Sequence, residues 1–218
     1  MSATTRRRTA QVAVVVGVLI LLVWLLLDPR PIQDPAKPQP PAQQAVAAGS
    51  VLKPKPCYRG ATAPFTPTRI TVPGVTRDAT VLALPRDADN VPSAPPISDV
   101  GKTQFAWSVP PDPKPGSTQG NALFNAHTWP DGTALGNKLL DGLQVGDRII
   151  VHGKLHGVPQ TLCYRVTKRD VIVASDGSVE YYRTDGPPQL ALIVCSPPRL
   201  GPGNWLHRTI WYAEPLAS

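Results

Sequence analysis

Hydrophobic and polar positions divide the chain into three parts. Val12–Leu27 contains no polar side chain, and Pro29–Pro56 is rich in Pro, Gln and Ala without any apolar periodicity. From Cys57 onward, short runs rich in β-branched residues alternate with clusters of Gly, Pro, Asn and Asp. This alternation is typical of an all-β barrel or sandwich. We therefore expect a folded β domain that follows an apolar segment and a spacer.

Eight runs in the last part have the length and composition of strands. One short stretch, Asn137–Leu143, has a helical pattern, and Leu143–Asp147 has the pattern of a turn that leads into a strand. A domain of roughly 160 residues can close eight strands around an interior filled with side chains. The predicted fold is therefore a closed, eight-stranded all-β barrel with short helices. The expected strands are Arg69–Val72, Thr80–Leu84, Asn121–Ala126, Arg148–His152, Gln160–Lys168, Val171–Ala174, Gln189–Cys195 and Arg208–Ala213.

The apolar segment has the features of an uncleaved membrane anchor. As a helix, Val12–Leu27 spans roughly 24 Å, against about 30 Å for the hydrocarbon core, and bilayers thin locally around short spans. Arg6–Arg8 precede it, so the positive-inside rule places the amino terminus in the cytoplasm and the rest of the chain outside. A cleaved signal peptide is the alternative, but Asp28–Pro31 offers no small-residue cleavage site.

These features predict four regions. Residues 1–11 form a basic cytoplasmic tail, 12–27 a single transmembrane helix, 28–56 an extracellular Pro-rich linker, and 57–218 the β-barrel domain. The linker buries too little apolar surface to offset the entropy of ordering its backbone, so we expect an extended, polyproline-like spacer. It would hold the folded domain away from the cell membrane.

Composition and charge exclude one class of partner. The 27 prolines of the 218-residue chain exceed the usual share of about 5%, and eight of them cluster in the linker. The net charge is +7 at pH 7, but Arg6–Arg8 lie in the tail and the other basic residues are scattered. A nucleic-acid reader usually concentrates its basic residues on one face. We therefore expect no nucleic-acid partner.

The three cysteines, at 57, 163 and 195, suggest a disulfide and a free thiol. In an oxidising compartment, one pair and one single cysteine is the natural arrangement. A bond between Cys57 and Cys163 would tie the leading edge of the domain to its body. The alternative, in which both are reduced, stays open.

Three side chains with potential chemistry stand at the ends of predicted strands. Cys195 ends an apolar run and is followed at once by a Pro-rich loop, so its thiol is expected at the barrel rim. His127 follows the strand Asn121–Ala126 in the same way, and Arg208 opens the last strand. Each has an ordinary explanation by itself, as a buried small hydrophobe, a loop histidine and a charged strand residue.

Together these residues resemble the active-site motifs of the sortases. The segments are Asn125–Trp129, Leu192–Cys195 and Arg208–Trp211, which follow the family's order of His, Cys and Arg. Gly142–Asp147 is similar to the family's loop before its fifth strand, and Asn90–Pro95 to the approach to its central strands. The resemblance covers about residues 60–215 and is strongest to the actinobacterial class F sortases.

The chain departs from the sortase pattern at two positions. Val194 stands where the family usually has Thr immediately before the nucleophile, and Ala126 stands where a small residue, often Gly, precedes the His. Neither change removes a catalytic group. The threonine hydroxyl helps to shape the substrate groove in the family, so Val194 implies a change in specificity or activity.

The resemblance implies a cysteine transpeptidase. Cys195 would attack a peptide carbonyl and form a thioester, His127 would act as general acid and base, and Arg208 would stabilise the oxyanion or hold the substrate. The implied substrate is an LPXTG-like sorting signal of a secreted protein, and the acceptor is an amine of the cell wall or of another protein. The chemistry requires no cofactor or metal, and the chain has no acidic cluster for calcium.

Other functions fit the sequence less well. L,D-transpeptidases place their cysteine in a Ser-His-Gly-Cys context, whereas Leu192–Val194 precede Cys195. NlpC-type peptidases have the cysteine before the histidine. The non-enzymatic alternative is a weak or inactive sortase-like β-barrel that serves as a tethered binding module.

Overall fold

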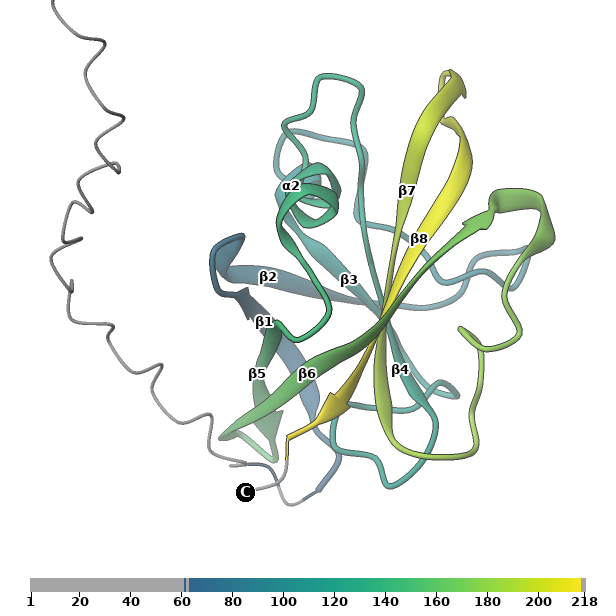
Figure 1. Cartoon of the computed structure of the whole chain (residues 1–218). Coiled ribbons are helices and arrows are strands. Elements are labelled where there is room, and N and C mark those ends of the chain that lie inside the picture. Colours follow the sequence, from purple (N-terminus) through teal and green to yellow (C-terminus); the bar gives the residue numbers. More distant parts are fainter. Residues whose placement is uncertain (1–60, 62, 217–218) are drawn as a thin grey trace, which may run out of the picture. The chain divides into compact units, whose positions relative to one another are not determined.

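Eight strands hydrogen-bond to one another in a closed ring, in the order β1-β2-β3-β4-β7-β8-β6-β5 (Figure 1). The computed structural model describes residues 61 and 63–216. The pairs β2–β3 and β4–β7 are parallel, and the other pairs are antiparallel. The predicted closed eight-stranded barrel is confirmed. Its strands are β1 (Thr66–Val72), β2 (Thr76–Leu84), β3 (Phe105–Ser108), β4 (Asn121–Ala126), β5 (Arg148–Leu155), β6 (Val158–Val173), β7 (Gln189–Gly201) and β8 (Asn204–Pro215).

The strand assignment differs most from the prediction at three places. β7 continues past Cys195 to Gly201 and β8 begins at Asn204, because the Pro-rich run after Cys195 stays paired with β8, so Cys195 and Arg208 lie inside strands and not at strand ends. β3 was not predicted, because all four of its side chains are buried and give no alternation of apolar and polar positions. Gln160–Lys168 and Val171–Ala174 were predicted as separate strands, but β6 is a single strand of 16 residues. The polar Arg169 and Asp170 look like a break, yet they pair with Trp211 and Ile210 of β8.

The helix α2 (Leu135–Gly142) begins two residues earlier than predicted, and two short 3₁₀ helices, η1 (Gly101–Thr103) and η2 (Ala174–Asp176), complete the elements. Leu135, Leu139 and Leu143 are buried in the barrel's core cluster. This spacing of four residues puts one apolar stripe of the helix against the barrel. In Figure 1, α2 lies in the connection between β4 and β5.

Alternate residues of the strands next to the site face two different clusters. In β7, Leu190, Leu192 and Val194 belong to the main core, whereas Ala191 belongs to a second, smaller cluster and Ile193 packs against it. β4 and β8 divide in the same way between the two clusters. Because side chains of a strand alternate between its faces, the smaller cluster marks the outer face of the barrel wall.

Several predictions concern residues outside the described range. The tail, the apolar segment 12–27, the linker 28–56 and Cys57 all fall within residues 1–60. Within residues 61 and 63–216, no helix has the length and apolar character needed to cross a membrane. Cys163 lies buried in β6 and is disulfide-bonded, while Cys195 is a free cysteine. The pairing of Cys163 with Cys57 stays a prediction.

Candidate functional site

Three neighbouring strands place Cys195, His127 and Arg208 in one row. β4 pairs with β7 in parallel register, Ala126 opposite Val194, so His127 follows beside Cys195. β7 pairs with β8 so that Cys195 lies directly opposite Arg208. Adjacent strands lie about 4.8 Å apart. The thiol therefore stands between the two other predicted site residues.

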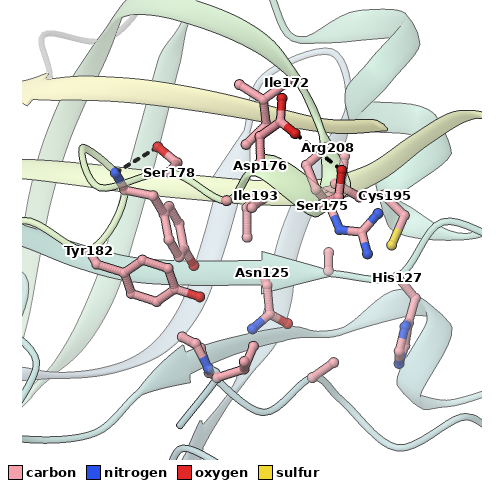
Figure 2. A pocket seen from close by; sticks show the side chains of 18 residues that line it. Asn125, His127, Ile172, Ser175, Asp176, Ser178, Tyr182, Ile193, Cys195 and Arg208 are labelled. Carbon is pink, nitrogen blue, oxygen red and sulfur yellow. Dashed lines mark hydrogen bonds between the residues drawn. The ribbon is translucent and has the colours of Figure 1, made fainter. Parts of the chain in front are cut away.

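The row borders a pocket of about 480 Å³ on the outer face of the barrel. Cys195, His127 and Arg208 all line it, so the structure brings together the three residues singled out in the sequence. Figure 2 shows the sulfur of Cys195 close to the guanidinium of Arg208, with the imidazole of His127 extending away from the sulfur. The pocket can therefore hold a ligand that contacts all three of these side chains.

The apolar part of the pocket lies along the same strands. Ile193 of β7 and Ile172 of β6 line it together with Tyr181 and Tyr182, which precede β7. Tyr181 is fully buried and its hydroxyl donates to the carbonyl oxygen of Phe124 in β4, at 3.2 Å. That bond fixes the covering segment to the barrel wall, so the pocket has a defined apolar side.

Cys195 is half-buried, and its surroundings act on the thiol in opposite directions. Burial raises the pKa of Cys195 above its ordinary value, because the thiolate loses hydration. The positive charge of Arg208 lowers that pKa, but by less than burial raises it. Arg208 is itself held in place, since Nη1 donates to the carbonyl oxygens of Trp205 at 3.1 Å and His207 at 3.0 Å.

His127 is held at the exit of β4 by backbone groups. Its Nε2 forms a hydrogen bond with the carbonyl oxygen of Pro95. Its own carbonyl oxygen accepts from the backbone N–H of Gly136, at 2.7 Å. A Cβ at Gly136 would come within 2.4 Å of that carbonyl oxygen, so the close approach of α2 requires glycine.

The residues after His127 connect β4 to both β7 and α2, and sequence reasoning did not identify them. The buried Thr128 donates its hydroxyl to the carbonyl oxygen of Cys195, at 2.6 Å. Asn137 in α2 accepts from the backbone N–H of Trp129 at 2.9 Å and donates to its carbonyl oxygen at 3.0 Å. These side chains therefore fix the backbone that carries His127 relative to the strand that carries Cys195. The available signal for Thr128 was its place in the segment Asn125–Trp129, whereas no signal in the sequence pointed to Asn137.

Val194, the residue where the sortase pattern usually has Thr, is 2% exposed and belongs to the core cluster inside the barrel. It also borders the pocket. The methyl groups of valine suit the apolar interior, where a hydroxyl would need a partner. The position at which the chain departs from the sortase pattern therefore lies between the pocket and the barrel core.

Asn125, two residues before His127, points from β4 into the pocket (Figure 2). It is 8% exposed, and its Nδ2 donates to the carbonyl oxygen of Ser93 at 3.0 Å. Its Oδ1 has no hydrogen-bond partner among the described residues. The pocket therefore contains a polar acceptor in addition to the three predicted residues.

The remaining histidines do not line this pocket. His152 Nδ1 contacts the Thr161 hydroxyl at 3.0 Å, and His207 Nδ1 contacts the carbonyl oxygen of Pro197 at 2.7 Å. His156 lies in the turn between β5 and β6. The described residues contain no group of three or more His, Cys, Asp and Glu side chains arranged to hold a metal ion.

No family model matches the sequence, and no curated protein matches it. Among solved structures, Streptococcus agalactiae sortase C1 in complex with MTSET is 20% identical over 69% of this chain and 68% of that chain, with a TM-score of 0.49. Sortase C1 from Streptococcus suis is 16% identical over 72% and 75%, with a TM-score of 0.48. Listeria monocytogenes sortase A is 18% identical over 68% and 86%, with a TM-score of 0.46.

Proposed function

We propose that this protein is a cysteine transpeptidase of the sortase type. The observation that supports this most directly is the row of His127, Cys195 and Arg208 on three neighbouring strands, all at one pocket. A thiol, an imidazole and a guanidinium at one peptide-sized cavity suit acyl transfer. The reaction breaks a peptide bond and passes the acyl group to a second amine.

In the first half of the reaction, the thiolate of Cys195 attacks the carbonyl carbon of the scissile peptide bond. His127 gives a proton to the departing amine, and a thioester forms on the sulfur. In the second half, an incoming amine attacks the thioester and loses its proton to His127. The sulfur is released, and water in place of the amine gives hydrolysis.

Arg208 contributes a fixed positive charge at the position where negative charge develops. It lies opposite Cys195 in β8, and two backbone carbonyl groups hold its Nη1. A preorganised cation in a partly dehydrated site stabilises an oxyanion more than the neutral ground state. It also favours the thiolate that starts the reaction.

Our proposal extends to the class, location and partners of the enzyme. The resemblance over about residues 60–215 is strongest to the actinobacterial class F sortases, and we assign the protein to that class. The segment 12–27 anchors the chain in the cell membrane, and residues 28–56 hold the barrel outside the cell. The substrate is an LPXTG-like sorting signal, and the acceptor is an amine of the cell wall or another protein.

The proposed function is tested by incubating the full-length protein with LPXTG-like peptides, with and without amine acceptors such as oligoglycine. Mass spectrometry is expected to detect a thioester on Cys195, a hydrolysed peptide and, with the acceptor, a joined product. The Cys195→Ala variant should give none of these. Cleavage of the peptide that persists in this variant would contradict the assignment.

A tethered binding module is the alternative, and the raised pKa of Cys195 is the observation that favours it. A thiol that stays protonated at neutral pH is a poor nucleophile. Alkylation of Cys195 across the pH range distinguishes the two functions. A rate that is the same in wild type and in His127→Ala, together with the absence of a thioester, would support the binding module.

A further inference from the structure

The segment Val91–Pro96, which we call the strap, contacts the side chains of Asn125 in β4 and of His127, the residue that follows β4. The carbonyl oxygen of Ser93 accepts from Asn125, and that of Pro95 is bonded to Nε2 of His127. Val91, Pro92 and Ala94 of the strap line the pocket itself. The strap is therefore a wall of the site and also a direct partner of the proposed acid and base.

The chemistry of the Pro95 contact determines the tautomer of His127. A carbonyl oxygen only accepts hydrogen bonds, so Nε2 must carry a proton. In the neutral imidazole, Nδ1 is then the nitrogen without a proton. It is the single ring atom able to take a proton from an amine and return it.

We propose that the strap is a positioning element for the reaction, and that Pro95 fixes the tautomer and the orientation of His127 through its carbonyl group. This inference rests on the proposed function for its catalytic consequence. The same arrangement, in which a third group orients the base, recurs among thiol and serine acyl-transfer enzymes. Here a backbone carbonyl takes that place.

The first end of the strap is fixed by Arg86. The guanidinium donates to both carboxylate oxygens of Asp112, at 2.7 Å and 3.0 Å, and to the carbonyl oxygen of Asn90 at 2.8 Å. Asp112 is 3% exposed and also accepts from the Ser108 hydroxyl at 2.6 Å. The same guanidinium lies 5.0 Å from the ring centroid of Tyr182, a residue that lines the pocket. The strap thus begins at a buried, hydrogen-bonded ion pair.

The second end of the strap is fixed by close backbone packing. The buried Gly101 lies so near Pro96 that an added Cβ would fall 1.8 Å from the Pro96 carbonyl oxygen and 2.9 Å from its carbonyl carbon. No real contact of this length exists, so any side chain at position 101 has to displace Pro96. Because Pro95 is the preceding residue, its carbonyl group would move as well.

The tautomer can be measured directly by ¹⁵N NMR of the full-length protein labelled at histidine. The chain has four histidines, and a His127→Gln variant assigns the signal of His127. We expect the neutral ring to show a protonated Nε2 and an unprotonated Nδ1. A protonated Nδ1, or rapid averaging between the two tautomers, would overturn the proposal. This measurement does not depend on any peptide substrate.

The catalytic consequence is tested with Gly101→Ala, and Gly201→Ala is the matched control. Nothing lies within 4 Å of a Cβ at Gly201, which is at the far end of β7. A displacement of about 1 Å at a reacting group costs on the order of 100-fold in rate. We expect Gly101→Ala to lose about that factor in kcat with little change in KM, and to lose the single tautomer, while Gly201→Ala behaves as wild type.

If Gly101→Ala fails to fold, Arg86→Lys provides the second variant, because a point charge cannot hold Asp112 and Asn90 together. If Gly101→Ala or Arg86→Lys folds and keeps both the kcat and the His127 tautomer of the wild type, the proposal is overturned. A wild-type protein that cleaves no sorting-signal peptide would instead count against the proposed function. The tautomer measurement would still decide the role of the strap.

Discussion

At the scale of single residues, the site balances a buried thiol against a fixed cation. Burial raises the pKa of Cys195, and Arg208 on the opposite strand partly offsets it. Only the thiolate attacks a carbonyl or an alkylating reagent, so both groups control the rate at a given pH. Removing the cation raises the pKa further and leaves less thiolate at every pH below it.

The Arg208→Gln variant should therefore react more slowly with iodoacetamide. We expect the rate-against-pH curve of Cys195 to move to higher pH, and the rate at pH 8 to fall. Arg165→Gln is the control, since Arg165 is exposed in β6 and paired with Arg148 of β5, away from the pocket. A curve that stays in place in Arg208→Gln would show that the guanidinium does not act on the thiol.

At the scale of elements, the sequence pattern located most of the strands but not all of their ends, and not their neighbours. β4 lies where it was predicted, because turn residues follow its apolar run at Thr128–Gly132. His127 does follow the end of β4, but Cys195 and Arg208 lie inside β7 and β8, so their predicted places at strand ends were wrong. The register that joins β4, β7 and β8 depends on long-range pairing, which local patterns do not encode.

The residues that hold the site in place were harder to predict from the sequence than the three site residues themselves. Pro95 acts through a carbonyl oxygen, which every residue possesses, so its side chain gives no signal. Thr128 and Asn137 look like ordinary turn and cap residues until α2 and β7 are placed beside them. Such contacts appear only once the barrel has closed.

Thr128 supplies a test of this connection between elements. In Thr128→Val the shape is nearly kept, but the buried carbonyl oxygen of Cys195 loses its donor. We expect a loss of about 1–3 kcal/mol in the free energy of unfolding, measured in urea, and a lower kcat for peptide cleavage. Thr133→Val, in an exposed position of the same loop, should change stability by less than about 0.5 kcal/mol. Equal effects of the two substitutions would exclude a special role for Thr128.

At the scale of the whole molecule, the pairing of β5 with β1 closes the ring of strands, and Cys163 is buried in β6, the other neighbour of β5. Cys163 is disulfide-bonded, and Cys195 is free. The chain has three cysteines, so the predicted partner of Cys163 is Cys57. A covalent link of this kind restricts the unfolded chain more than the folded barrel.

Counting thiols in the denatured, unreduced protein tests the pairing. We expect one reactive thiol, assigned to Cys195 because the Cys195→Ala variant has none. Reduction should expose the other two and lower the free energy of unfolding by about 4–5 kcal/mol, the chain-entropy value for a loop of roughly 100 residues. Three thiols before reduction would contradict the bond.

The alternation of side chains along β7 has a consequence for how the protein is made. A slip of one residue in the pairing of β7 would turn Cys195 into the barrel interior and bring Val194 to the surface, since successive side chains face opposite sides of a sheet. A misassembled barrel would then retain its strand content and yet show an inert sulfur. The fraction of molecules that an alkylating probe modifies thus offers a count of correct assembly, which circular dichroism cannot supply.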